Sequence, residues 1–335
     1  MEKILLLLHT EPDGSLARPA LEAVTAAQAL APHRLTIGLI GASVDTGAAQ
    51  AAGCSTRILA VTGEPFAQSR YATDAAAAEA LCRAAEAELV LAPSTARWSR
   101  VLPGVALRLN GRIDTHATAL ARQNGVPAVT RWFYRQRIEA VLTRAQRPWF
   151  ILLDPGCCAP YPGAPGAAQI ETVVVETPAC RTAVTGIQAP PAGEQTIRPD
   201  AKLLFVAGAG WTKKQSDGAV HAAEAEQLIL GFLHASQGSL GGSKSLVDQS
   251  GEGEAVLKCM THLNQVGQTG STPRHPKGLS TCCHGEEPHT VGWRFVTERR
   301  AINLDPSCGW ARGKADVLYV ADAFQVLREL IAILR

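Results

Sequence analysis

The sequence has few aromatic residues, no marked excess of charge of either sign and no long apolar run. Phe, Trp and Tyr make up 5% of its 335 residues, and 32 basic side chains stand against 30 acidic ones, a net charge of +2. This balance argues against nucleic acid or an anionic membrane as the main partner. No stretch approaches the roughly 18 apolar residues that span a bilayer. We therefore expect no nucleic-acid partner and no stable membrane insertion.

Cysteine is present, but not in the pattern of a disulfide framework. The nine cysteines are an odd number scattered along a long chain, which indicates free thiols in a reducing compartment. The first apolar run, residues 4–8, is too short for a secretory signal and is better explained as a strand. We expect no targeting segment, and a cytoplasmic protein of bacterial type.

The common motifs for nucleotides and metals are missing. No Gly-x-Gly-x-x-Gly or Gly-Lys-Ser/Thr follows the first predicted strand. Cys157 and Cys158 are adjacent and lack a Cys-x-x-Cys partner, so they are interpreted as loop thiols. A cluster of Cys259, Cys282, Cys283 and His284 is the best metal candidate, but its contiguous members cannot easily close a tetrahedron. We predict no catalytic residue and no metal, with a metal at this cluster as the minor alternative.

Alternating strands and helices dominate the first half of the chain. Strands are predicted at residues 3–9, 35–40, 57–61, 89–92, 129–133, 139–143, 149–153 and 171–176. Helices are predicted at 19–30, 48–52, 71–87 and 100–109, the last with Pro103 in its first turn. This alternation predicts a parallel sheet covered on both faces. Because its carboxyl-edge loops lack a phosphate-binding fingerprint, the first half is interpreted as a scaffold or partner surface.

A proline-rich stretch, residues 185–199 with Pro190, Pro191 and Pro199, divides the chain. We predict an N-terminal domain over 1–188, a hinge near 185–199 and a second domain over 189–335. Strands at 203–206, 293–297, 301–306 and 316–320 and helices at 219–234, 246–248 and 324–334 follow the boundary. The predicted fold class is α/β with two domains: a parallel-sheet, nucleotide-hydrolase-like domain, then a doubly wound, Rossmann-like domain.

Glycine-rich or polar turns recur at the predicted strand ends of the second half. Residues 207–214, with Gly210, Lys213 and Lys214, form either a phosphate site at a helix N-terminus or a tight turn with solvated lysines. Ser243 and Lys244 follow in a second such turn. Five such turns in succession predict the edge at which a doubly wound sheet binds an extended dinucleotide.

Several motifs match one family in order and spacing. They are Gly241-Gly242-Ser243-Lys244, Gln265-Val266-Gly267-Gln268-Thr269-Gly270, the segment 282–289, Ile302-Asn303-Leu304-Asp305-Pro306, and Ala315-Asp316 with Asp322-Ala323-Phe324. In the first half, Leu91-Ala92-Pro93-Ser94-Thr95 and residues 100–106 agree as well. On these residues nearly the whole chain resembles the alpha subunit of electron transfer flavoprotein, and the six-residue motif at 265–270 is unaltered.

The resemblance implies an FAD held mostly by the second domain. It implies that Thr269 donates its hydroxyl toward flavin N5, that His289 lies near the flavin C2 carbonyl, and that Asn303 and Asp322 contact the adenosine end. The residues so assigned to the cofactor are Gly210, Ser243, Lys244, Gln265, Val266, Gly267, Gln268, Thr269, Gly270, His284, Gly285, Glu286, Glu287, Pro288, His289, Asn303 and Asp322.

The resemblance also implies an electron carrier without a substrate-converting site of its own. Its partners would be a beta subunit that carries AMP, a flavoprotein dehydrogenase as electron donor and a quinone oxidoreductase as acceptor. A flavin that cycles by single electrons gains from positive charge near N1 and the C2 carbonyl, which Lys244 and His289 can supply. The altered residues suggest a dedicated donor, such as an amine or N-methyl-amino-acid dehydrogenase.

The chain departs from the family at several of these positions. Lys244 stands where the family has Arg and loses the forked donor, and Gly210 stands where it has a second Arg. In the loop 282–289, two cysteines, His284, two glutamates and Pro288 replace small, apolar or amide residues. One alternative is therefore a subunit with weakened or lost FAD that acts structurally in a dehydrogenase complex. A second is an NAD-dependent oxidoreductase, against which the missing Gly-x-Gly-x-x-Gly counts.

Overall fold

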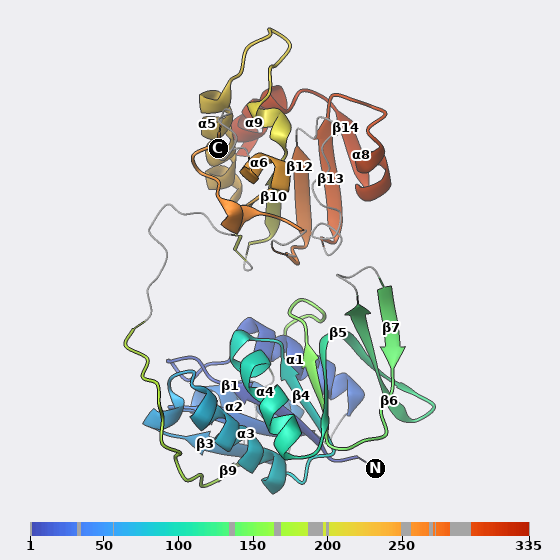
Figure 1. Cartoon of the computed structure of the whole chain (residues 1–335). Helices are drawn as coiled ribbons and strands as arrows, with labels where there is room; N and C mark the ends of the chain where they lie inside the picture. The colour runs from blue at the N-terminus through green and yellow to red at the C-terminus, as the bar shows by residue number, and fades with distance from the viewer. Residues whose placement is uncertain are drawn as a thin grey trace. The chain divides into compact units, whose positions relative to one another are not determined.

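The protein consists of two compact α/β units, 1–187 and 188–335. The computed structural model describes residues 2–31, 35–55, 57–133, 138–163, 169–186, 197–198, 201–248, 256–267, 271, 273–281 and 296–334. Figure 1 shows the first unit in blue to green and the second in yellow to red. Each unit has its own sheet and its own buried clusters of apolar side chains. The predicted α/β class is confirmed.

Unit 1 is built on one large sheet. Within its described residues the strand order is β7-β6-β5-β8-β4-β1-β2-β3-β9, and the strands from β5 to β9 in this order run parallel. The strands β5, β6 and β7 form an antiparallel meander at one side. The bounds are β1 Ile4–His9, β2 Leu35–Gly41, β3 Arg57–Thr62, β4 Leu89–Pro93, β5 Arg112–Gln123, β6 Val126–Phe133, β7 Ile138–Leu142, β8 Trp149–Leu153 and β9 Ile170–Thr172.

Helices cover both faces of the parallel part of this sheet. They are α1 Arg18–Leu30, α2 Asp45–Ala51, α3 Tyr71–Ala84 and α4 Ala96–Arg108. The side chains of Leu6 and Leu8 join the cluster formed with α1 and α2, whereas Leu5 and Leu7 join the cluster formed with α3 and α4. Because β1 is buried on both faces, its sequence is a continuous apolar run rather than an alternating one.

Unit 2 has a smaller sheet, described with five strands in the order β11-β10-β12-β13-β14, all parallel. The strands are β10 Leu203–Ala207, β11 Ser239–Gly242, β12 Lys277–Thr281, β13 Glu298–Asn303 and β14 Val317–Val320. The helices are α5 Ala222–Ser236, α6 Lys244–Asp248, α8 Gly309–Lys314 and α9 Ala323–Leu334, with 3₁₀ turns at Ala209–Thr212 and His262–Asn264. The core includes Trp211 and Phe324, whose ring centroids lie 4.6 Å apart.

Three strands were not predicted: β5, β11 and β12. β5 reads Arg-Ile-Asp-Thr-His-Ala-Thr-Ala-Leu-Ala-Arg-Gln and has no apolar run, and β11 and β12 are short and contain glycine. Each is a strand because it lies beside other strands: β5 beside β8, β11 beside β10, and β12 between β10 and β13. Pairing with neighbours, not local propensity, creates them.

Other predicted elements have different bounds. The helix predicted from residue 100 begins at Ala96, where Thr95 accepts a hydrogen bond from the Trp98 backbone, so Pro103 lies inside the helix and not in its first turn. The strand predicted at 171–176 is described only over Ile170–Thr172. Of the strand predicted at 293–297, Val296 and Thr297 are not strand residues, and the others lie outside the described residues.

A buried ion pair joins α3 to α4. Arg97 Nη2 lies 2.6 Å from Asp74 Oδ1, Arg97 Nε lies 2.9 Å from Asp74 Oδ2, and Nη2 also donates to the Phe66 carbonyl at 2.8 Å. Burial raises the pKa of Asp74, and the Arg97 guanidinium opposes that rise. The ionisation of Asp74 therefore depends on Arg97.

Replacing Asp74 with Ala is expected to destabilise unit 1 by about 3–5 kcal/mol, because Arg97 stays buried without its counter-charge. The measurement is the urea transition followed by far-UV circular dichroism. Glu79→Ala, which removes the partly exposed partner of Arg83 and Arg108, is the control and should leave the transition nearly unchanged. If Asp74→Ala and Glu79→Ala shifted the urea transition by equal amounts, the buried ion pair would have no special role in stability.

Candidate functional site

Predicted cofactor residues lie along the carboxyl edge of the sheet in unit 2. Gly210 follows β10, Ser243 follows β11, Asn303 ends β13 and Asp322 follows β14. Since all five strands are parallel, their carboxyl ends lie at one edge. From β11 to β14 this row covers four strand spacings, roughly 19 Å. Such a row suits an extended ligand better than a compact one.

The sheet changes its direction of growth at β10. The chain places β11 on one side of β10 and then returns to place β12 on the other. Doubly wound sheets bind their ligands at such a switch point. The turn after β10 is fixed there, because Trp211 Nε1 donates to Thr281 Oγ1 at 2.8 Å and Gly208 N donates to the Thr281 carbonyl at 2.9 Å.

Asn303 and Asp322 lie close together at one end of the row. Ala321 N donates to the Asn303 carbonyl at 3.3 Å, and Gln215 Nε2 donates to the Gly210 carbonyl at 3.0 Å. Gln215, Asn303 and Asp322 line a hollow of about 10 Å³, room for at most one water. The hollow thus groups two predicted residues with Gln215, which the sequence analysis missed because it belongs to no recognisable motif.

The residues 265–267 lie at the other end, beside β11. Gln265 forms a parallel bridge with Gly242, and Val266 N donates to the Gly242 carbonyl at 3.0 Å. Ser271 N donates to the Gln265 carbonyl at 2.8 Å and Gly267 N to the Ser271 carbonyl at 2.7 Å, so Ser271 lies beside residues 265–267. Gly267 has φ +82°, a conformation that favours glycine. The unaltered motif therefore begins next to Ser243.

The two glycines of β11 allow this close approach. A Cβ on Gly241 would lie 2.6 Å from Val266 Cγ2, and one on Gly242 would lie 2.2 Å from Met260 Cε. Any side chain at Gly241 would push the 265–267 segment away from the sheet. Gly241 hence has a packing role that is independent of any ligand, whereas at Gly242 the flexible end of Met260 can move aside.

The polar residues of the row also stabilise helices. Ser243 is fully buried and its Oγ accepts from Leu246 N at 3.2 Å, which caps α6. Asp322 Oδ1 accepts from Gln325 N at 2.9 Å at the start of α9. Asn303 Oδ1 accepts from Asp305 N at 3.0 Å. These bonds fix where each polar group lies at the edge.

Lys244 has an acidic neighbour. Among the predicted cofactor residues that the structure describes, it is the only cation. Its Nζ forms an ion pair with Asp248 one helical turn later, and His262 Nδ1 lies 3.8 Å from the other Asp248 oxygen. About 40% of the Lys244 side chain is exposed. The cation is thus accessible, but its charge is partly balanced within the chain.

The remaining predicted residues lie outside the described residues. They are Gln268, Thr269, Gly270, His284, Gly285, Glu286, Glu287, Pro288 and His289. Cys282 and Cys283, part of the alternative metal cluster, lie there too. In the part of the chain that the structure describes, no group of three or more His, Cys, Asp or Glu could hold a metal ion.

The switch point of unit 1 has different chemistry. It lies between β1 and β4, where His9 Nε2 is 3.4 Å from Thr95 Oγ1 and the His9 ring centroid is 6.0 Å from that of Trp98. Burial, together with the charge of Arg97, lowers the pKa of His9 to about 4. These side chains contact one another, as in a packed scaffold.

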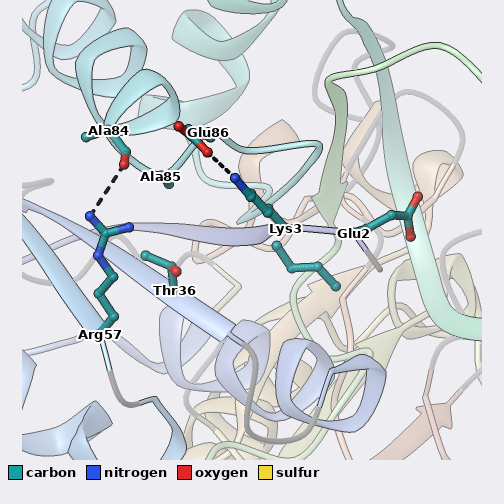
Figure 2. A pocket seen from close by; sticks show the side chains of 8 residues that line it. Glu2, Lys3, Thr36, Arg57, Ala84, Ala85 and Glu86 are labelled. Carbon is teal, nitrogen blue, oxygen red and sulfur yellow. Dashed lines mark hydrogen bonds and ion pairs between the residues drawn. The ribbon is translucent and has the colours of Figure 1, made fainter.

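A larger hollow in unit 1 lies at the opposite edge of its sheet. Its volume is about 590 Å³, and it is lined by Glu2, Lys3, Ile4, Thr36, Arg57, Ala84, Ala85 and Glu86. Figure 2 shows Lys3 paired with Glu86 and Arg57 directed at the Ala84 carbonyl. Arg57 also pairs with Glu171 at 3.1 Å. The cations that line this hollow have acidic partners, and the hollow lies at the amino ends of the strands. It therefore does not resemble a nucleotide site.

Comparison with known proteins identifies the first unit. A model of the electron transfer flavoprotein domain matches residues 4–179, more than half of the chain. A search of curated proteins finds no match. No helix among the described residues is long and apolar enough to cross a membrane. The family match covers unit 1, while the row of predicted cofactor residues lies in unit 2.

The partly buried His9 is expected to make unit 1 sensitive to acid. Its pKa in the folded state, about 4, lies below the ordinary value of 6.5, so the unfolded chain binds more protons between these values. Stability should therefore fall as the pH drops from 6.5 toward 4, by at most roughly 3 kcal/mol. Urea unfolding at pH 7 and pH 5 measures this loss.

The variant His9→Gln should lose less stability than the unaltered chain over that interval. His116→Gln, at a histidine whose side chain is 64% exposed, is the matched control and should behave like the unaltered chain. If the His9 variant lost as much stability as the control, burial of this ring would not explain the acid sensitivity.

Proposed function

The chain belongs to the electron transfer flavoprotein domain family, and from that premise we propose that it is the FAD-binding, alpha-type subunit of an electron transfer flavoprotein. Members of this family carry electrons and do not convert a substrate. The observation that carries the proposal is the row of Gly210, Ser243, Asn303 and Asp322 at the carboxyl edge of unit 2, with residues 265–267 beside it.

The donor set along this edge fits FAD. It offers the hydroxyl of Ser243, the amides of Gln265 and Asn303, the carboxylate of Asp322 and the ammonium of Lys244. A hydroxyl that accepts one hydrogen bond still has a proton to donate, and a carboxylate with one oxygen in a cap still has the other. The cap at Asp322 therefore leaves this carboxylate able to contact a ligand, whereas the fully buried Ser243 keeps a proton to donate but has no exposed surface.

FAD, when bound, supplies electron transfer in one-electron and two-electron steps. The chain's own contribution is to bind and orient the cofactor and to set the charge near its pyrimidine ring. Lys244 is the described cation for this purpose, with Asp248 and His262 beside it. A lysine is a compact point charge, without the planar fork of an arginine, so it stabilises a reduced flavin less directionally.

The partners follow from the family. We propose that unit 1 binds a beta subunit that holds AMP, that a flavoprotein dehydrogenase donates electrons, and that a quinone oxidoreductase accepts them. An amine or N-methyl-amino-acid dehydrogenase is the proposed donor. The complex would act in the cytoplasm, at the start of a respiratory chain.

A second candidate is a structural subunit that has lost FAD. It is supported by the caps at Ser243 and Asp322, because these bonds give both residues a role without any ligand. Purification of the chain with its co-expressed beta subunit separates the two candidates. A yellow complex with about one FAD per chain is expected, and a colourless, folded heterodimer that takes up no FAD would support the structural role.

Removing the charge of Lys244 is expected to lower the potential of the bound flavin. Lys244→Met should lower it by roughly 60 mV, about 1.4 kcal/mol for one electron, since a reduced flavin carries more negative charge. Lys244→Arg should keep or raise the potential. Spectroelectrochemical titration gives the values.

Lys258→Met is the matched control, because Lys258 is an exposed lysine of the same unit that precedes the 265–267 segment. It should leave the potential unchanged. An unaltered potential in Lys244→Met with FAD still bound would remove Lys244 from the cofactor's surroundings.

A further inference from the structure

Two adjacent thiols of unit 1 have no part in the proposed function. Cys157 and Cys158 follow β8, and both are reduced and half-buried. Adjacent Cα atoms are about 3.8 Å apart, so the two sulfur atoms can reach the same small reagent. No other cysteine in the described part of the chain is next to a second one. The pair can therefore react as a dithiol, which a single cysteine cannot do.

The turn that carries the pair is fixed at its start. Cys157 N donates to the Asp154 carbonyl at 3.4 Å, and Pro155 and Gly156, with φ +81° at Gly156, fit the centre of a type II turn. Gly156 N donates to Glu22 Oε2 at 2.6 Å, and Glu22 is 3% exposed. A buried carboxylate of α1 therefore holds the backbone directly before the two cysteines.

The chain is fixed again shortly after the pair. Tyr161 N donates to the Leu21 carbonyl of α1 at 3.0 Å. The side chains of Cys157, Cys158 and Tyr161 pack against the apolar cluster formed with α1 and α2. The two thiols thus lie at the margin of the core, on a backbone that is held on both sides of them, and both residues keep exposed surface.

Several other cysteines of the chain are shielded from reagents. Burial raises the pKa of Cys54 to about 11 and also raises the pKa of Cys82. Burial raises the pKa of Cys259 to about 11 as well. A thiol must lose its proton before it acts as a nucleophile, so these three cysteines react poorly at neutral pH. Reagents in solution should therefore reach the half-buried pair first.

A histidine lies at the same edge of the sheet. The Nδ1 atom of His116, in β5, lies 3.3 Å from Asp154 Oδ1, on the first residue of the cysteine turn. His116 has φ +57°, and the register between β5 and β8 shifts between Asp114 and Ala117. Such irregularities redirect a side chain. Here the imidazole lies beside the turn, where it can accept the proton that a thiol loses before it reacts.

A disulfide between adjacent residues is strained. Disulfides prefer Cα atoms about 4.4–6.8 Å apart, whereas adjacent Cα atoms are about 3.8 Å apart across a trans peptide bond. Strain of this kind makes a disulfide easier to reduce. A bond between Cys157 and Cys158 is therefore suited to reversible oxidation and not to a permanent cross-link.

We propose that Cys157 and Cys158 form a dithiol site that a low-molecular-weight disulfide oxidises reversibly. One cysteine loses its proton to His116, and its thiolate attacks a sulfur of the small disulfide, whose S–S bond breaks and releases one thiol. The second cysteine attacks the resulting mixed disulfide, which releases the second thiol and forms the bond between the cysteines. The pair loses two electrons and two protons, and the small disulfide gains both. The reaction needs no FAD.

The test treats the full chain with oxidised glutathione and follows the products by mass spectrometry. Cleavage after glutamate releases residues 140–171, which contain these two cysteines and no others. We expect this fragment to lose two hydrogen atoms in mass, to carry no glutathione, and to regain the hydrogen atoms in excess reduced glutathione. In Cys157→Ser the same fragment should keep one bound glutathione, because the second thiol is missing.

Cys180 is a control within the same chain. It is exposed and has no adjacent cysteine, and it lies in the separate fragment 177–194. This fragment should carry glutathione in the unaltered chain. The proposal is overturned if residues 140–171 stay reduced while Cys180 reacts, or if they carry glutathione in the unaltered chain. A fragment that stays oxidised in excess reduced glutathione would be a stable cross-link, which also overturns it.

The role of His116 is tested by the rate of disulfide formation at pH 7. His116→Gln should slow the loss of the two hydrogen atoms at least about tenfold, since a positioned base typically contributes more than this. His234→Gln, at an exposed histidine of unit 2, is the matched control and should leave the rate unchanged. Circular dichroism checks that each variant is folded. An equal rate in His116→Gln would overturn the role assigned to this histidine.

Discussion

The central strands of both units pair in parallel, so the chain must cross a face of the sheet before each new strand can be added. This constraint buries the central strands on both faces and places all their carboxyl ends at one edge. In unit 1 it explains the continuous apolar run of β1, whose alternate leucines enter two different clusters. In unit 2 it collects the ends of five strands, which are far apart in sequence, into one row.

The row in unit 2 stabilises local structure, and in the proposed function it binds the cofactor as well. Ser243 and Asp322 cap helices, Asn303 fixes the turn after β13, and Gly241 lets the 265–267 segment lie against the sheet. Side chains used in this way are held in place before a ligand binds. Binding then loses less conformational entropy, because these side chains are already ordered. The same hydrogen bonds also give these residues a structural role in a chain that has lost the cofactor.

The two units differ at equivalent positions of their sheets. At the switch point of unit 1, His9, Thr95 and Trp98 contact one another, whereas the switch point of unit 2 has a glycine-containing turn fixed by Thr281. Unit 1 instead has a three-stranded antiparallel meander at one side of its sheet. In the proposed function the second unit binds the cofactor and the first unit binds the partner.

Much of the fold could be predicted from local pattern, because an apolar run such as residues 4–8 or a helical spacing such as 19–30 carries its own signal. The strands β5, β11 and β12 could not, since their polar or glycine-containing sequences become strands only beside a neighbour. The start of α4 was misplaced because the cap at Thr95 is a single hydrogen bond without an apolar pattern.

The sequence by itself determined the two α/β halves, the proline-rich boundary and the polar turns with their order. Only the tertiary structure decided that β10 is the switch strand, that Gln265 lies beside Gly242, and that Gln215 joins Asn303 and Asp322. The reason is physical: hydrophobic periodicity and turn chemistry act over a few residues, whereas strand order depends on which distant segments pair. The edge at which the proposed cofactor site lies is a product of that pairing.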